Sequence, residues 1–75
     1  MTGTEARALA IGDELLPIDE VISAGYRASD GHLKAIEELP PGYYNKTPKE
    51  WREYNLYWAK VHYSASKYLE EAKNE

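Results

Sequence analysis

Cysteine is absent from this chain of 75 residues, so the protein contains no disulfide and no thiolate metal site. Its two histidines, His32 and His62, lie thirty residues apart and do not have the spacing of a zinc motif. A chain this small seldom buries enough apolar surface to be stable without a disulfide, a metal or a partner. We therefore expect it to be stabilised by a second copy of itself or by another protein, with no cofactor.

Long apolar runs are missing as well. No segment approaches the roughly 18 consecutive apolar residues that a helix needs to cross a bilayer. The first twelve residues, MTGTEARALAIG, carry an arginine and a glutamate before a very short apolar stretch, which is not the pattern of a signal peptide. These absences predict a cytoplasmic protein without a membrane partner.

A large net charge is also absent, because 13 acidic and 9 basic side chains leave a formal charge of −4. This balance argues against non-specific binding of nucleic acid by the chain as a whole. The charges are unevenly distributed. Residues 1–39 contain eight acidic and three basic side chains, whereas residues 40–75 contain five acidic and six basic ones. Two helices with these opposite tendencies attract each other when they pack antiparallel.

The clearest local pattern starts at Thr47 and predicts a helix from about residue 48 to residue 73. The Thr47 hydroxyl can accept a hydrogen bond from the amide of Glu50, the Glu50 carboxylate can reach the amide of Thr47, and Pro48 occupies the first helical position. Apolar and aromatic residues then recur at steps of three and four, which predicts one buried helix face. That face comprises Trp51, Tyr54, Trp58, Val61, Ala65, Tyr68 and Ala72.

A second helical phase predicts one helix over residues 17–39, with a kink between Gly25 and Gly31 left open. Each glycine weakens a helix interior by roughly 1 kcal/mol relative to alanine. Asp30 could also cap a new helix at this point. The alternative is therefore two shorter helices, over residues 17–28 and 31–39.

The Pro-Pro-Gly sequence at residues 40–42 ends this helix, because proline cannot continue a helix and disfavours helical dihedral angles in the residue before it. The loop of residues 40–46 is short enough to return the chain antiparallel. The sequence therefore predicts an all-α antiparallel helical hairpin over residues 17–75, within a single domain that forms a dimeric helical bundle. Residues 1–16 form an N-terminal arm, either a short helix over residues 5–11 or an extended segment.

Trp58 lies at the middle of the predicted buried face, and counting outward from the loop places it opposite Gly25, Ala28 and Ser29. Small residues opposite a large one would give the complementarity that a packed interface needs. We therefore expect Trp58 to be a central core residue of the helix pair.

Catalytic constellations are not evident in the sequence. Ser66 lies four residues after His62 and could contact it on a helix, but neither an oxyanion-hole motif nor a glycine-rich elbow accompanies this pair. His32 lies in the apolar phase of its helix, where a hydrogen-bonded packing histidine is far commoner than a metal ligand. The sequence therefore predicts a protein that is not an enzyme, with no catalytic, cofactor-binding or metal-binding residue.

The aromatic surface of the helix over residues 48–73 is wider than one partner helix can cover. Tyrosine and tryptophan are enriched at the hot spots of protein interfaces. Three partners could cover the excess: the N-terminal arm of the same chain, a second copy, or a different protein. We favour a second copy and expect a homodimer. The interface residues would be Tyr54, Leu56, Tyr57, Trp58, Val61 and Tyr63.

Basic residues alternate with tyrosines on the same helix, a pattern that can bind single-stranded nucleic acid. They are Lys46, Lys49, Arg52, Lys60 and Lys67. Glutamates share their faces, however, and Lys49 and Glu53 form an i, i+4 pair, so a solvated, salt-bridged face is the better interpretation.

The favoured hypothesis is a non-enzymatic helical protein that self-associates and binds an unidentified protein as an accessory or regulatory factor. Its size and composition are common among small factors encoded by phages and plasmids, which is an association only. The alternative is a small nucleic-acid-binding regulator that uses the basic and aromatic face of the C-terminal helix.

Overall fold

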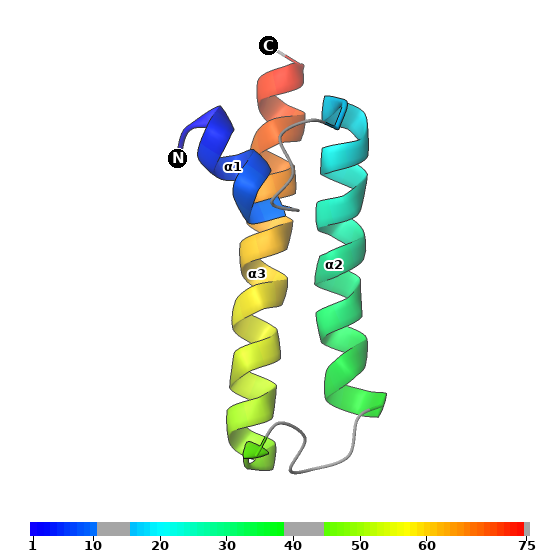
Figure 1. The fold of residues 1–75 in the computed structure, drawn as a ribbon, viewed down its shortest axis with the longest axis vertical. Coiled ribbons are helices and arrows are strands. Elements are labelled where there is room, and N and C mark those ends of the chain that lie inside the picture. Colours follow the sequence, from blue (N-terminus) through cyan, green and yellow to red (C-terminus); the bar gives the residue numbers. More distant parts are fainter. Residues whose placement is uncertain (11–15, 39–44, 75) are drawn as a thin grey trace.

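The structure, a computed structural model of the chain, describes residues 1–10, 16–38 and 45–74. These residues form three helices and no strand (Figure 1): α1 (Gly3–Ala10), α2 (Ile18–Glu38) and α3 (Pro48–Lys73). The all-α class predicted from the sequence is confirmed for this part of the chain.

α1 shows that residues 3–10 of the N-terminal arm form a short helix, while most of the alternative extended segment falls outside the described residues. It begins at Gly3, two residues before the predicted start, while Ile11 at the predicted end lies outside the described residues. The amide of Glu5 donates a hydrogen bond to Thr2 Oγ1 at 3.1 Å, so a threonine hydroxyl satisfies one of the unpaired amides at this helix start.

α2 is one unbroken helix that passes through both Gly25 and Gly31, so the alternative of two shorter helices is wrong. Gly25 is buried, and a Cβ atom placed there would overlap the hydroxyl of Ser66 and lie 3.1 Å from the Cβ of Ala10. A Cβ atom at Gly31 would meet no atom within 4 Å. Close packing therefore requires glycine at position 25 and not at position 31.

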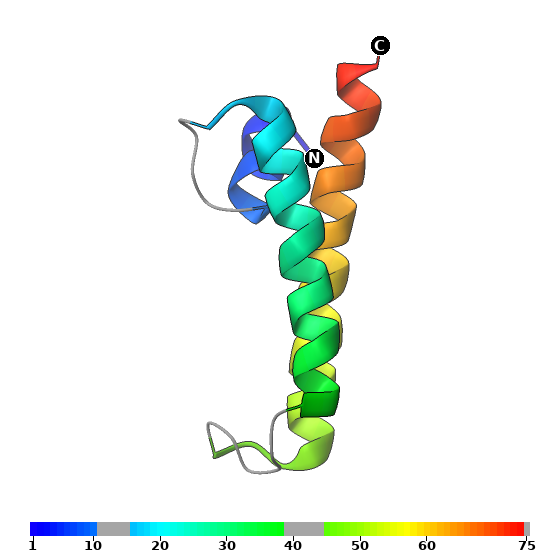
Figure 2. The ribbon, with the colours of Figure 1, turned by 90° about the vertical axis from the view of Figure 1, so that its right-hand side faces the viewer.

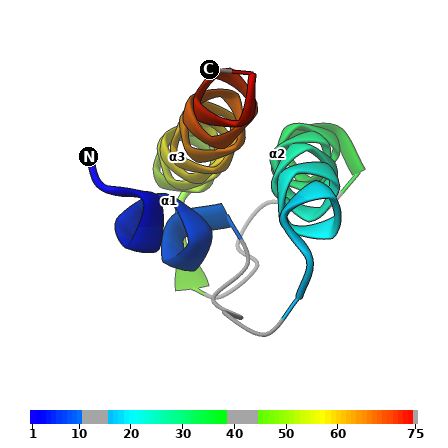
Figure 3. The ribbon, with the colours of Figure 1, turned by 90° about the horizontal axis from the view of Figure 1, so that it is seen from above.

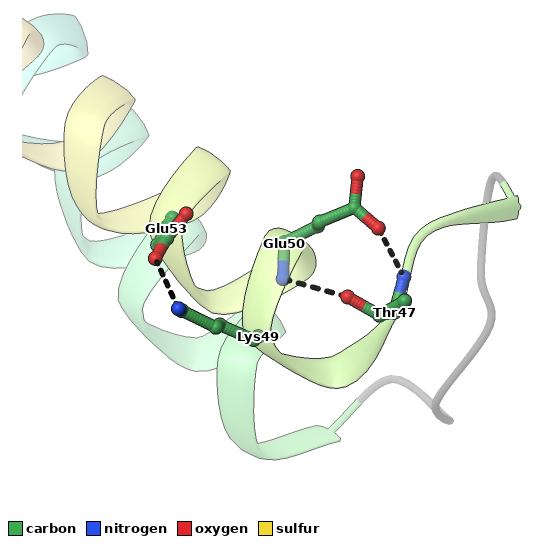
Figure 4. Close-up of polar contacts among 4 residues, drawn as sticks. All are labelled: Thr47, Lys49, Glu50 and Glu53. Atoms are coloured by element: carbon green, nitrogen blue, oxygen red, sulfur yellow. Dashed lines mark hydrogen bonds and ion pairs between the residues drawn. The ribbon is translucent and has the colours of Figure 1, made fainter.

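α3 begins with the predicted capping box (Figure 4). The Glu50 amide donates to Thr47 Oγ1 at 3.1 Å, and the Thr47 amide donates to the Glu50 carboxylate at 3.2 Å. The hydrogen bond from the Thr47 amide, followed by the contact with the Thr47 side chain, holds the pKa of the Glu50 carboxyl below its usual range. Lys49 and Glu53 form the predicted i, i+4 ion pair at 4.0 Å.

The three helices form an elongated bundle with extents of 42 × 19 × 16 Å. α2 and α3 lie side by side and run in opposite directions (Figures 1 and 2). α1 packs on one side of this pair, near the start of α2 and the end of α3 (Figure 3). The buried apolar core is concentrated where the three helices meet. It consists of Ala6, Ala10, Val21, Ile22, Ala65 and Leu69.

Hydrogen bonds from side chains to backbone carbonyls join α2 and α3 along their length. Ser66 Oγ donates to the carbonyl of Ile22 at 2.9 Å, and Ser29 Oγ donates to the carbonyl of Ala59 at 2.8 Å. The indole N–H of Trp51 donates to a third carbonyl, near the other end of the pair. Residue numbers rise along one helix as they fall along the other, so these bonds define the register of the two helices.

The buried face of α3 is rotated about the helix axis by roughly one residue position relative to the predicted face. Its members are Trp51, Asn55, Ala59, Ala65, Ser66 and Leu69. Most of the predicted face is therefore wrong: Trp58 and Val61 are half-buried, and Tyr54, Tyr68 and Ala72 are exposed. Hydrophobic periodicity misplaced the face because polar Asn55 and Ser66 occupy its centre.

Trp58 is not the central contact between α2 and α3. The carbonyl of Ala59 accepts the Ser29 hydrogen bond, so the smaller neighbour occupies the position expected for Trp58. The Trp58 ring instead packs near the rings of Tyr57 and His62. The two helices approach so closely at this level that the seam accommodates small side chains rather than an indole.

Gly25 and Gly31 provide a matched pair of substitutions. Gly31→Ala should stabilise the protein by up to about 1 kcal/mol, because alanine is the better helix former and its methyl group meets no neighbour. Gly25→Ala should destabilise the protein by about 1–3 kcal/mol, because the same methyl group overlaps Ser66. Urea unfolding measures both changes. A Gly25→Ala protein as stable as the wild type would contradict this packing.

Thr47→Ala should lower the free energy of unfolding by about 1 kcal/mol, because it removes the acceptor for the Glu50 amide. Glu50→Ala should then have a smaller effect than in the wild type, since the two residues share one capping box.

Because the folded-state pKa of Glu50 is lowered, its stabilisation is present above the unfolded-state pKa and is lost as the pH falls through the folded-state value. Urea unfolding at neutral and acidic pH tests both points, and strictly additive losses would show that the box does not act as a unit.

Candidate functional site

The described residues contain no group of three or more His, Cys, Asp or Glu side chains that could hold a metal ion. The Ser66 hydroxyl, which the sequence spacing brings near His62, is buried and donates to a backbone carbonyl of α2. Its hydrogen is therefore directed away from the imidazole, and the arrangement does not activate Ser66 as a nucleophile.

His32 and His62 stack on each other, with ring centroids 5.4 Å apart and an interplanar angle of 12°. His62 Nδ1 lies 2.6 Å from the carbonyl oxygen of Leu9 in α1, so this nitrogen carries the hydrogen. Asn55 donates its amide to the carbonyl of Trp51, which leaves its oxygen facing His32 Nδ1 at 2.9 Å. The stacked pair thereby connects all three helices. Two nearly parallel rings do not direct their lone pairs at a common point, so they make a poor metal clamp.

A cluster of rings follows α3 from its first turn to its middle. Tyr54 stands between Trp51 and Trp58, at centroid distances of 6.0 and 6.5 Å, and Tyr57 meets Trp58 at 5.3 Å. The ammonium of Lys46 lies 4.9 Å from the centroid of Tyr54. Aromatic pairs in these geometries contribute about 0.5–1.5 kcal/mol beyond their burial. We call these four side chains (Trp51, Tyr54, Tyr57 and Trp58) the ring cluster. Three of them, Tyr54, Tyr57 and Trp58, belong to the predicted interface and make intramolecular contacts.

An apolar groove of about 250 Å³ opens between α2 and α3. We call it the α2–α3 groove, and its lining residues are Ser29, Leu33, Leu56, Ala59, Lys60, Tyr63 and Ser64. Leu33 is 45% exposed and Tyr63 is 50% exposed, so two large side chains of this groove remain in contact with water. The ring of Tyr26 packs edge-on against Tyr63 at 5.4 Å and extends the apolar surface along α2.

A second groove, of about 330 Å³, lies between α1 and α3. We call it the α1–α3 groove, and its lining residues are Met1, Leu9, Tyr57, Lys60, Val61 and Ser64. Tyr57 is 61% exposed and presents most of its ring to solvent. Because Lys60 and Ser64 border both grooves, they form a ridge that separates them.

The structure distributes the six predicted interface residues over three places on α3. Leu56 and Tyr63 line the α2–α3 groove. Tyr57 and Val61 line the α1–α3 groove. Tyr54 and Trp58 belong to the ring cluster. The sequence missed Leu33 and Leu9, which line these grooves from α2 and α1. Leu33 follows the apolar phase of α2, and only the packing of the helices shows that it borders a groove.

The basic residues considered for nucleic-acid binding lie on several sides of α3 and its start. Lys49, Lys60 and Lys67 recur at steps of eleven and seven residues, which places them on one side of the helix. Lys49 is paired with Glu53 and Lys46 lies over an aromatic ring, whereas Arg52, Lys60 and Lys67 are exposed.

No protein-family model, no curated protein and no solved structure matches this chain. Among the helices that the structure describes, none is both long and apolar enough to cross a membrane.

Trp51 and Trp58 both belong to the ring cluster but differ in burial. Trp51 is 6% exposed and its indole N–H donates to the carbonyl of Ala35 at 3.1 Å, whereas Trp58 is only half-buried. Trp51→Ala should therefore cost about 3–5 kcal/mol, and Trp58→Ala should cost clearly less. Trp51→Phe, which keeps a ring and removes the donor, should cost about 1 kcal/mol and keeps the measurement possible if the alanine variant unfolds. Thermal unfolding followed by circular dichroism ranks the three, and the reverse order for the alanine variants would refute the assignment.

Proposed function

We propose that this protein is a non-enzymatic helical hairpin that self-associates as a homodimer and binds another protein as an accessory or regulatory factor. The observation that carries the proposal is the α2–α3 groove, where Leu33 and Tyr63 expose about half of their surface beside half-buried Leu56. Contiguous exposed apolar surface on a small protein commonly marks an interaction site.

The distribution of the core supports association. The buried apolar cluster lies where α1 meets the other helices, and among the described residues the remaining length of α2 and α3 is covered by their own contacts and the ring cluster. A domain of this size has little apolar burial to spare. Packing a second copy on the α2–α3 groove would extend the core along the rest of the pair, and every contact would be made twice by symmetry.

The α1–α3 groove supports the second part of the proposal. It lies around α3 from the α2–α3 groove, beyond the ridge of Lys60 and Ser64, so a dimer formed on one groove leaves the other accessible. Tyr57, with its ring largely exposed, has the side-chain type that anchors many protein interfaces. We assign the protein partner to this second groove.

Sedimentation equilibrium at micromolar concentration should show a dimer for the wild-type protein and a monomer for the variant Leu33→Ser with Tyr63→Ser. Both side chains are about half exposed, so the double variant should keep its helical circular dichroism while it loses association.

Two controls isolate the surface. Tyr68→Ser changes an exposed tyrosine outside both grooves, and Tyr57→Ala changes the α1–α3 groove, so both proteins should remain dimers. A wild-type protein that is a thermally stable monomer under these conditions would refute self-association.

A further inference from the structure

The side of the α2–α3 pair opposite α1 carries no further helix in the described part of the chain (Figure 3). On α2, four residues spaced at steps of four, three and four share this side, namely Tyr26, Asp30, Leu33 and Glu37. On α3, this side contains the groove residues Leu56, Lys60 and Tyr63. It also contains Lys49, seven residues before Leu56, and Lys67, seven residues after Lys60, because a spacing of seven returns to the same side of a helix. We call this side the open face.

The open face has an apolar centre with borders of opposite charge. Its α2 border is acidic, with Asp30 and Glu37 exposed. Its α3 border carries the exposed basic residues Lys49, Lys60 and Lys67, which outnumber the acidic residues on the same side, Glu53 and Glu71; Glu53 is ion-paired with Lys49. A face with one acidic and one basic border is complementary to itself only when it meets a second copy in one particular orientation.

We propose that two copies pack their open faces together about a two-fold axis that runs parallel to the helices. α2 of each copy then faces α3 of the other, and the two α1 helices lie on the outside of a four-helix bundle. This arrangement rests on the proposed self-association and specifies its geometry, with a second copy of this chain as the occupant of the α2–α3 groove.

The register within one copy brings opposite charges to the same level. The Ser29–Ala59 hydrogen bond places residue 30 level with residue 58, and a two-fold axis parallel to the helices keeps that level in the second copy. Asp30 then lies within one helical turn, about 5.4 Å, of the level of Lys60 in the second copy. By the same count along the helix axis, Glu37 lies within one helical turn of the level of Lys49 in the second copy.

A two-fold axis perpendicular to the helices gives the opposite result. It would place α2 against α2, so that Asp30 and Glu37 would face the acidic border of the second copy. Like charges brought together in an interface are a strong penalty against an arrangement. The charges of the open face therefore select the parallel axis.

The size of the open face is sufficient for a dimer. α2 contains 21 residues and is about 31 Å long at 1.5 Å per residue. Two helices, each about 10 Å wide, present roughly 600 Å² per copy, so the dimer would bury about 1,200 Å² in total. This total is within the range of stable and specific interfaces.

Charge reversal tests the orientation. Asp30→Lys with Glu37→Lys makes the α2 border basic, and Lys49→Glu with Lys60→Glu makes the α3 border acidic. Each double variant should raise the dimer dissociation constant by at least about ten-fold, because like charges then face each other at both symmetric contacts. The four-fold variant that combines them should recover dimerisation to near the wild-type value.

Mixing the four-fold variant with affinity-tagged wild-type protein distinguishes the two axes. With the parallel axis, acidic would face acidic and basic would face basic between the two proteins, so each should form only homodimers. With the perpendicular axis, mixed dimers would be favoured. Arg27→Glu with Glu38→Lys, a reversal on the outward side of α2, is the matched control and should leave dimerisation unchanged.

The outcomes separate the two proposals. A monomeric wild-type protein overturns self-association itself. A wild-type dimer whose dissociation constant is insensitive to both double variants, or which forms mixed dimers with the four-fold variant, overturns the parallel axis alone. Circular dichroism and thermal unfolding of each variant check that lost association does not reflect lost folding.

Discussion

The close approach of α2 and α3 is the constraint on which the rest of the structure depends. Two serine hydroxyls, Ser29 and Ser66, reach backbone carbonyls of the opposite helix at 2.8 and 2.9 Å, which is possible only when the two backbones lie near each other. Gly25 leaves the space that Ser66 fills. Large rings do not fit in the middle of such a seam, so Trp58 and the tyrosines of α3 lie at its borders, whereas Trp51 is buried near the far end of the helix pair. The ring cluster and both grooves follow from this arrangement.

The seam is polar as well as close. Asn55 is 1% exposed and bonds both to the carbonyl of Trp51 and to His32, and no buried side-chain nitrogen or oxygen of the described residues lacks a hydrogen-bond partner. Such a network specifies one register. A shift of one residue would separate Ser66 from the carbonyl of Ile22 and the Asn55 oxygen from His32, at about 1–3 kcal/mol each. A purely aliphatic seam would tolerate the same shift far better.

Local signals explain how much of this architecture could be predicted from the sequence. A capping box and a proline mark the start of α3, and the predicted span of residues 48–73 agrees with the observed helix. α2 needed only its unbroken helical phase, although two glycines weakened the prediction. The faces were harder, because a seam centred on Asn55 and Ser66 gives no hydrophobic signal. The predicted interface was a band on one helix, whereas each groove is made jointly by two helices and depends on packing that no single helix encodes.

The position of the core has a consequence for the order in which the helices pack. Its cluster joins Ala6 and Ala10 of the first helix to Ala65 and Leu69 near the end of the last one. α1 therefore depends on partners in α3 that lie more than fifty residues away along the chain, and α2 alone gives it only part of its contacts. Contacts so distant along the chain are closed late, because the loop entropy must be overcome before the contacts stabilise anything. α1 is thus expected to dock after α2 and α3 have paired, in a late step that completes the core.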